Sequence, residues 1–351
     1  METAHRLFAA HGAVALPPHA ESGALVWPAA LWQKVDEAGF PLALLSEDEG
    51  GFGLEPGDAL SLVRLAAFHG ASLPLGETLL ANAFFARAHL PVGTSPAAVV
   101  SHGSLVIRRE GDGLHLQGTA PRVAWARDAR VLAVLAHDAY GTPFLARVTT
   151  GWTTTPHHNM AAEPRDDVTF DLVLGSPEVA PSPVTAHTLL ALGGVLRAQA
   201  MAGAMENILE RTVEYANARV QFGKPIGRFQ AIQQNLAVMA THVAAARAGA
   251  DMAADAWSLE PDDAAAFCAF AAAAKIRAGE AAGLVASIAH QTHGAMGFSL
   301  DYPLHPFTRR LWAWREEFGA ESFWAEQLGA QVCALGADNF WPFLTQSGVR
   351  S

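Results

Sequence analysis

Two runs of mostly apolar side chains in the second half of the chain repeat every three or four residues. The first run is Met201, Met205, Ile208, Thr212 and Tyr215, and the second is Phe229, Ile232, Leu236, Met239 and Val243. Alternating spacings of three and four place these residues on one face of an α-helix, so each run predicts a helix packed in a bundle. A third bundle helix is expected over residues 264–289, where small alanine side chains permit close contact with neighbours.

The middle of the chain contains short β-type runs instead. They are Val99–Val100, Leu105–Ile107, Leu114–Leu116, Val131–Leu135, Phe144–Val148 and Val168–Leu174. The sequence Glu110-Gly111-Asp112-Gly113 is typical of a hairpin turn between two strands. This stretch therefore predicts a small antiparallel β domain, which Pro181 and Pro183 follow as an expected stiff linker.

The remaining pattern, before the β-type runs, reads as helical. The 351-residue chain is thus expected to contain an N-terminal helical domain over residues 1–95, a central β domain over 96–182 and a C-terminal helical bundle over 183–351. The predicted fold class is α+β and mostly α. A chain longer than about 250–300 residues commonly divides in this way.

Composition excludes several classes of partner. Lys and Arg total 23 against 34 Asp and Glu, a formal net charge of −11, so nucleic acid is not an expected partner. Cys268 and Cys333 lack the spacing of metal ligands, and we expect no metal site. Arg197 interrupts the most apolar stretch, which predicts no membrane insertion. The first residues show no secretion signal, so we expect a soluble protein of the cytoplasm.

Residues 219–230 connect the first two predicted bundle helices and read Arg-Val-Gln-Phe-Gly-Lys-Pro-Ile-Gly-Arg-Phe-Gln. Local rules explain part of this string: Gly223 suits the position after a helix end, Pro225 stops the helix, and Arg219 complements the helix dipole in the last turn. The whole string resembles the Arg-x-x-Phe-Gly-Lys-Pro-Ile-x-x-Phe-Gln signature of acyl-CoA dehydrogenases. Residues 291–298, Gln-Thr-His-Gly-Ala-Met-Gly-Phe, are similar to a second segment of that family, Gln-x-x-Gly-Gly-x-Gly-Tyr/Phe. The resemblance implies the family's fold of helical, β and bundle domains.

The resemblance also implies a cofactor and an oligomer. In this family FAD lies between the β domain and the bundle, and a neighbouring subunit holds part of it. Arg219 would therefore reach the diphosphate of a partner's FAD, since a guanidinium forms charge-assisted hydrogen bonds with phosphate oxygens. The residues implied around the adenine end are Phe222, Ile226, Phe229 and Gln230, and those implied to contact the dinucleotide from another chain are Gln291, Gly294 and Ala295. The implied assembly is a homodimer or homotetramer, or a heterotetramer with a related subunit.

The family's reaction removes the α-proton of an acyl-CoA thioester while a hydride passes from Cβ to FAD, with a glutamate as the usual base. Counting from the two motifs, the two usual positions of this glutamate fall on Phe318 and near Gly193, and neither is an acid. Glu317 and Glu316 directly precede Phe318. We therefore expect Glu317 to be the catalytic base, with Glu316 as the alternative, and electron-transfer flavoprotein as a candidate electron acceptor.

A further departure concerns the flavin ring. Residues 97–103 and 120–126 lack the usual hydroxyl groups with which many members contact the ring from the β domain. Three functions stay open. The chain is an FAD-dependent acyl-CoA dehydrogenase, a non-catalytic partner subunit that completes another chain's FAD site, or a flavin monooxygenase with the same fold.

Overall fold

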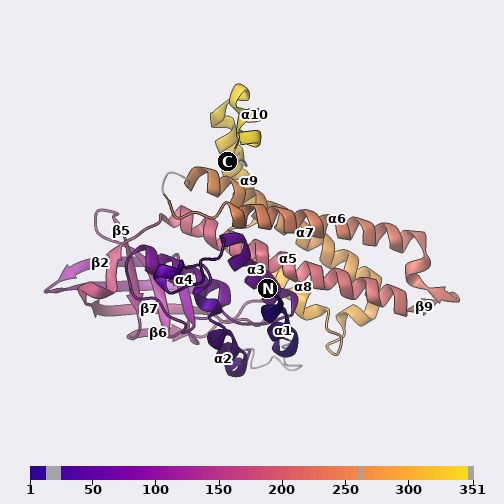
Figure 1. The fold of residues 1–351 in the computed structure, drawn as a ribbon, viewed down its shortest axis with the longest axis horizontal. Coiled ribbons are helices and arrows are strands. Elements are labelled where there is room, and N and C mark those ends of the chain that lie inside the picture. The colour runs from indigo at the N-terminus through magenta and orange to yellow at the C-terminus, as the bar shows by residue number, and fades with distance from the viewer. Residues whose placement is uncertain (13–24, 261–263, 347–351) are drawn as a thin grey trace.

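The structure is a computed structural model that describes residues 1–12, 25–260 and 264–346, with helices at both ends of the chain and a sheet between them (Figure 1). The N-terminal helices are α1 (Glu2–His11), α2 (Ala29–Glu37), α3 (Pro56–Phe68) and α4 (Leu75–Arg87). The strands of the main sheet are β1 (Ala97–Val100), β2 (Ser104–Glu110), β3 (Gly113–Ala124), β4 (Val131–His137), β5 (Pro143–Val148), β6 (Trp152–Thr155), β7 (Arg165–Leu174) and β8 (Val179–Pro181). The C-terminal helices are α5 (Ala186–Ala218), α6 (Gln230–Asp255), α7 (Ala264–His293), α8 (His305–Glu316), α9 (Glu321–Leu335) and α10 (Ala337–Gln346).

The fold class predicted from the sequence is confirmed, and the boundaries proposed at residues 95 and 182 fall in the α4–β1 and β8–α5 connections. Every predicted β-type run lies in a strand, and Glu110 pairs with Gly113 across the predicted hairpin turn. The short strands β6 and β8 were not predicted. Pro181 belongs to β8, where it pairs with Phe144, so the expected stiff linker begins later than predicted.

The sheet is mixed rather than wholly antiparallel. Its strand order is β6-β7-β3-β2-β4-β5-β8, and β1 also pairs with β4. Both β1 and β2 run parallel to β4, whereas the other pairs are antiparallel. The chain leaves β2 through the hairpin into β3 and returns in β4, which gives β4 the same direction as β1 and β2. Local sequence signals indicate the β2–β3 hairpin, but they do not indicate that β4 runs parallel to β1 and β2.

The helices confirm most of the predicted bundle pattern. In α5 the residues from Met201 to Thr212 in the first run are fully buried. In α6 burial of the second run begins only at Met239, because the first turns of this helix extend to the end of the bundle beside β9 (Figure 1). By length and hydropathy α5 could cross a membrane, a test that buried core helices also pass, and 94% of the qualifying window is buried inside the structure.

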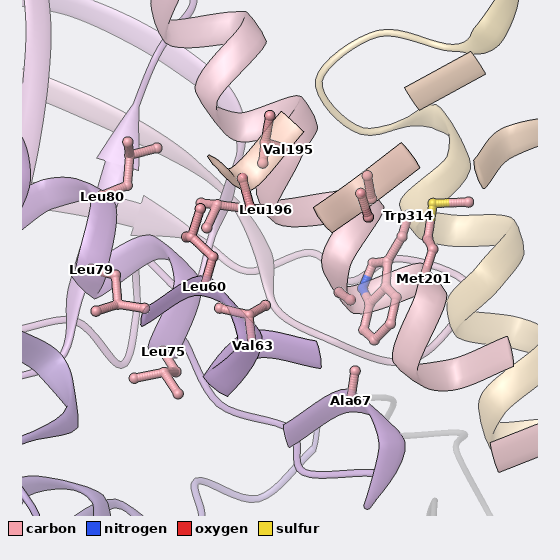
Figure 2. Close-up of a cluster of buried hydrophobic side chains, with 14 of the residues drawn as sticks. Leu60, Val63, Ala67, Leu75, Leu79, Leu80, Val195, Leu196, Met201 and Trp314 are labelled. Carbon is pink, nitrogen blue, oxygen red and sulfur yellow. The ribbon is translucent and has the colours of Figure 1, made fainter. Parts of the chain in front are cut away.

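One continuous apolar core joins the N-terminal helices to the bundle. Figure 2 shows Leu60 and Val63 of α3 and Leu79 of α4 facing Leu196 of α5, with Trp314 of α8 nearby. The sheet has a separate core, formed by side chains such as Val134 and Phe170. The helical core therefore brings α4, α5 and the end of α8 together beside one face of the sheet domain.

Candidate functional site

A cavity of about 840 Å³ lies between the sheet and the helices. Its sheet wall comes from the β1–β2 connection, from the end of β3 and from residues 157–160, and its helical wall comes from α5, α8 and residues 316–319. The volume lies within the range of about 300–1,000 Å³ that is typical of small-molecule sites. Among the described residues that line it, Ser101 alone carries a hydroxyl, and its Oγ lies 3.2 Å from His102 Nδ1.

Glu317 lies at the inner end of this cavity between two buried arginines. Arg165 of β7 donates to its Oε1 from Nη2 at 2.6 Å and from Nε at 2.8 Å, and Arg197 of α5 donates to its Oε2 at 2.6 Å. The other end of the Arg197 guanidinium is paired with Glu77 of α4. Both arginine side chains are about 6% exposed, so these ion pairs are almost fully removed from water. One cluster thus connects an N-terminal helix, the sheet and the bundle.

A third carboxylate, Glu163, extends the cluster. It lies 3.2 Å from Arg165 Nη2 and accepts a hydrogen bond from Trp314 Nε1 at 2.8 Å, and Arg310 Nε is 3.5 Å away. Buried charges are tolerated when each has opposite charges and hydrogen-bond partners, and removing one member leaves the others uncompensated. The alternating acids and arginines of this cluster meet that condition.

The sequence-based expectation that Glu317 is the catalytic base conflicts with this geometry. Burial alone would raise the pKa of the Glu317 carboxyl, but Arg165 and Arg197 outweigh it and lower the pKa from 4.5 to about 2. A carboxylate that is stabilised so strongly as the anion is a poor proton acceptor. Its physical role is to neutralise the two arginines.

The two positions at which the family carries its glutamate meet in space. A Cβ atom built on Gly193 of α5 would lie 2.1 Å from Cδ1 of Phe318, so the phenyl ring fills the space above the glycine. Phe318 has a left-handed backbone with φ 53°, and Arg197 Cζ lies 5.5 Å from its ring centre. An aromatic ring therefore occupies the region that an acid at either position would enter.

Lys275 fixes the backbone around Phe318. Its Nζ donates to the carbonyl oxygens of Arg315 at 2.6 Å and Gly319 at 2.7 Å, and the side chain is fully buried. Burial lowers the pKa of Lys275 to about 8. Glu316, in contrast, is exposed at the cavity and makes no hydrogen bond or ion pair with residues in the described ranges. Its proposed role as the alternative base stays a prediction.

The Arg219 segment forms a small hairpin at the end of the bundle that lies away from the sheet (Figure 1). Its strands are β9 (Val220–Gln221) and β10 (Lys224–Pro225), and the turn residues Phe222 and Gly223 have φ values of 52° and 82°. A two-residue turn of this kind requires positive φ at both positions. The prediction that Gly223 directly follows the helix end was wrong, because α5 ends at Ala218 and the glycine serves the hairpin turn.

The side chains expected to contact FAD are largely exposed in this hairpin. Arg219 and Gln230 are exposed, and Phe222 is 92% exposed although its ring contacts Phe229 edge-on with 6.2 Å between ring centres. Ile226, in contrast, is buried, so it anchors the hairpin to the bundle and offers little surface to a ligand.

The second motif lies at the same end of the bundle. Tyr215 of α5 stacks on His293 at the end of α7, with 4.3 Å between ring centres, which holds the two motifs together. Gln291 is in the last turn of α7, and Gly294 and Ala295 are in the short helix that follows it; all three are exposed. The surface here also exposes apolar side chains, among them Val220, Phe222, Met296, Phe298 and Leu300.

Comparisons with known proteins identify the family. Residues 184–332 match the acyl-CoA dehydrogenase C-terminal domain. The chain therefore carries the C-terminal domain of the acyl-CoA dehydrogenase family. The fold is similar over almost the whole length to a chain of the ChsE4–ChsE5 complex from Mycobacterium tuberculosis, with a TM-score of 0.81 at 24% identity, covering 96% of this chain and 99% of that one.

Similarity to curated acyl-CoA dehydrogenases is partial. IpdE2 of Mycobacterium tuberculosis is 37% identical over 131 residues, which is 37% of each chain. FadE27 of the same organism is 28% identical over 313 residues, covering 79% of this chain and 81% of FadE27. The alignments with the first four curated relatives cover only 26–39% of their lengths.

Replacing Glu317 by Gln should change how the stability of the protein depends on pH. The folded-state pKa is lowered, so the ion pairs of Glu317 stabilise the native state above pH 4.5, and this contribution is lost as pH falls toward 2. We expect Glu317→Gln to lower the free energy of unfolding at pH 7 by about 3–5 kcal/mol, because two buried arginines lose a partner. As pH falls from 4.5 to 2, the free energy of unfolding should decrease by about 3 kcal/mol less in the variant than in the parent.

Urea unfolding at a series of pH values measures both effects. Glu326→Gln, a change at an exposed position of α9, is the matched control and should leave the profile unchanged. Parallel pH profiles for the parent and Glu317→Gln would show that the carboxylate is not held by the arginines.

A second prediction concerns the contact between Gly193 and Phe318. Gly193→Ala places a methyl group against the ring at 2.1 Å and should destabilise the protein by about 1–3 kcal/mol through overpacking. The adjacent Gly194→Ala is the control, since its nearest atom would be 3.7 Å away. In a thermal-unfolding double-mutant cycle, Phe318→Ala should remove the penalty at position 193; additive effects of the two changes would disprove the contact.

Proposed function

We propose that this chain is a subunit of a heteromeric acyl-CoA dehydrogenase and completes an FAD site held mainly by a partner subunit. The complex desaturates an acyl-CoA thioester between Cα and Cβ, and the base that removes the α-proton belongs to the partner. The observation that carries this proposal is the Phe318 ring packed on Gly193, with neither family position supplying an acid.

The position of the Arg219 hairpin supports this division of roles. The hairpin lies at the end of the bundle away from the sheet (Figure 1). None of its residues lines the chain's own cavity, so a neighbouring subunit would receive them. Exposed apolar side chains beside it, such as Phe222 and Phe298, form a surface that a second subunit would cover.

The residues at this surface fit the diphosphate and adenine of FAD. Arg219 would donate charge-assisted hydrogen bonds to the diphosphate, Gln291 and the backbone at Gly294 would contact it from the second motif, and Phe222 would exclude water from the adenine end. When bound, FAD supplies the acceptor for the hydride that leaves Cβ. Ser101 is the single hydroxyl among the described residues of this chain's own cavity wall, which agrees with a flavin ring that is held elsewhere.

A homo-oligomeric dehydrogenase is the second candidate. Glu316 favours it, because this carboxylate is exposed at the cavity and unpaired among the described residues. Electron-transfer flavoprotein is the proposed electron acceptor in either case.

The spectrum of the purified chain distinguishes the two candidates. We expect the chain alone to contain little FAD and to show no bleaching with any acyl-CoA in the absence of oxygen. Co-expression with a related subunit should yield a yellow complex that acyl-CoA bleaches. Stoichiometric FAD in the chain alone, together with bleaching that Glu316→Gln abolishes, would replace the proposal by the second candidate.

Arg219→Ala tests the role of the hairpin in the complex. The loss of a charge-assisted phosphate contact should weaken FAD retention by about tenfold or more, while the melting temperature of the FAD-free chain stays unchanged. Arg228→Ala removes an exposed arginine from the same segment and is the matched control. Equal FAD dissociation constants for the parent and Arg219→Ala would restrict Arg219 to a structural role.

A further inference from the structure

The cavity wall carries an arginine whose backbone is held in an unusual conformation. The pairing of β3 with β7 shifts register between Ala120 and Val123, which marks a β-bulge, and Arg122 within it has φ 53°. Bulges re-aim side chains beside binding sites, and non-glycine residues in the left-handed region cluster at ligand clamps. The bulge therefore affects how Arg122 is placed on the cavity wall that it lines.

Asp167 of β7 holds the bulge through the backbone rather than through the arginine side chain. The Arg122 N–H donates to Asp167 Oδ1 at 2.9 Å, and Asp167 Oδ2 lies 3.5 Å from His157 Nε2. The carboxylate nearest to the bulge is therefore engaged by other groups. Within the described ranges the Arg122 guanidinium makes no hydrogen bond or ion pair, although it lines the cavity.

The other two arginines that line the cavity are already paired with carboxylates. Arg165 and Arg197 at the inner end are neutralised by Glu317 and Glu77. Arg122 is on the outer part of the same wall, and His102 and His157 also line the cavity on the sheet side. A guanidinium with imidazoles on the same wall matches an oxyanion, because its fork of N–H groups bonds two oxygens at once.

We propose that Arg122 is the anion-binding residue of this cavity and that it takes a phosphate or carboxylate oxyanion of the ligand that enters. The phosphates of coenzyme A and a carboxylate at the far end of an acyl group share this chemistry. The site depends neither on a partner subunit nor on the identity of the base, so it stands or falls independently of the proposed function.

The test measures binding of two probes to the isolated chain by calorimetry. Free coenzyme A carries phosphates without an acyl acid, and glutarate carries carboxylates without a phosphate. Arg122→Gln should weaken binding of the recognised probe by about tenfold or more, and the probe that is affected identifies the source of the oxyanion. Arg122→Lys keeps the charge without the fork and should recover part of the affinity.

Two further variants make the result specific. Arg109→Gln removes an exposed arginine from β2, outside the cavity, and should leave both affinities unchanged. Glu316→Gln removes the unpaired acid of the same cavity and should strengthen anion binding. The proposal is overturned if the parent binds neither probe, if Arg122→Gln binds both as the parent does, or if Arg109→Gln weakens binding equally.

Discussion

The ion pairs of Arg197 determine how the three parts of this chain meet. Arg197 of α5 pairs with Glu77 of an N-terminal helix and with Glu317 beyond α8. Arg165 of the sheet pairs with the same Glu317 carboxylate. Such charges are stable in a low-dielectric interior only with all partners in place. The inner end of the cavity therefore has a fixed, polar composition that an aliphatic acyl chain would not fill favourably.

The same ion pairs also leave Glu317 unsuited to act as a base in the cavity. A carboxylate that removes a proton needs a pKa near the pH at which the enzyme works, and it must not be held in strong ion pairs. The only carboxylate next to Phe318 on its N-terminal side, Glu317, is committed to the arginines, and the Phe318 ring occupies the space above Gly193. Most residues that resemble the family's FAD motif, in contrast, are exposed at the other end of the bundle, with Ile226 as the buried exception. Neither of the two positions at which the family carries its glutamate is thus an acid in this chain.

The sequence predicted the elements whose signals are local. The three-and-four spacing identified α5, the sequence around Gly111 identified a hairpin, and the family motifs indicated the fold. The mixed sheet, the hairpin role of Gly223 and the partners of Glu317 depend on residues far apart in the chain; Glu77 and Arg197 are 120 residues apart, and Arg165 and Glu317 are 152 apart. One local signal was present, since an arginine inside an apolar helix implies a buried acid that pairs with it.

The ionisation of the Glu317 carboxyl tests most directly whether Arg165 and Arg197 hold this residue as an anion. Carbon-13 NMR of the protein labelled at glutamate carboxyl carbons follows each titration, and the spectrum of Glu317→Gln assigns the resonance. The account predicts that this carboxyl stays ionised well below pH 4, with a pKa of about 2. A titration midpoint at or above 4.5 would contradict it, because Glu317 would then be free of the arginines and available as a base.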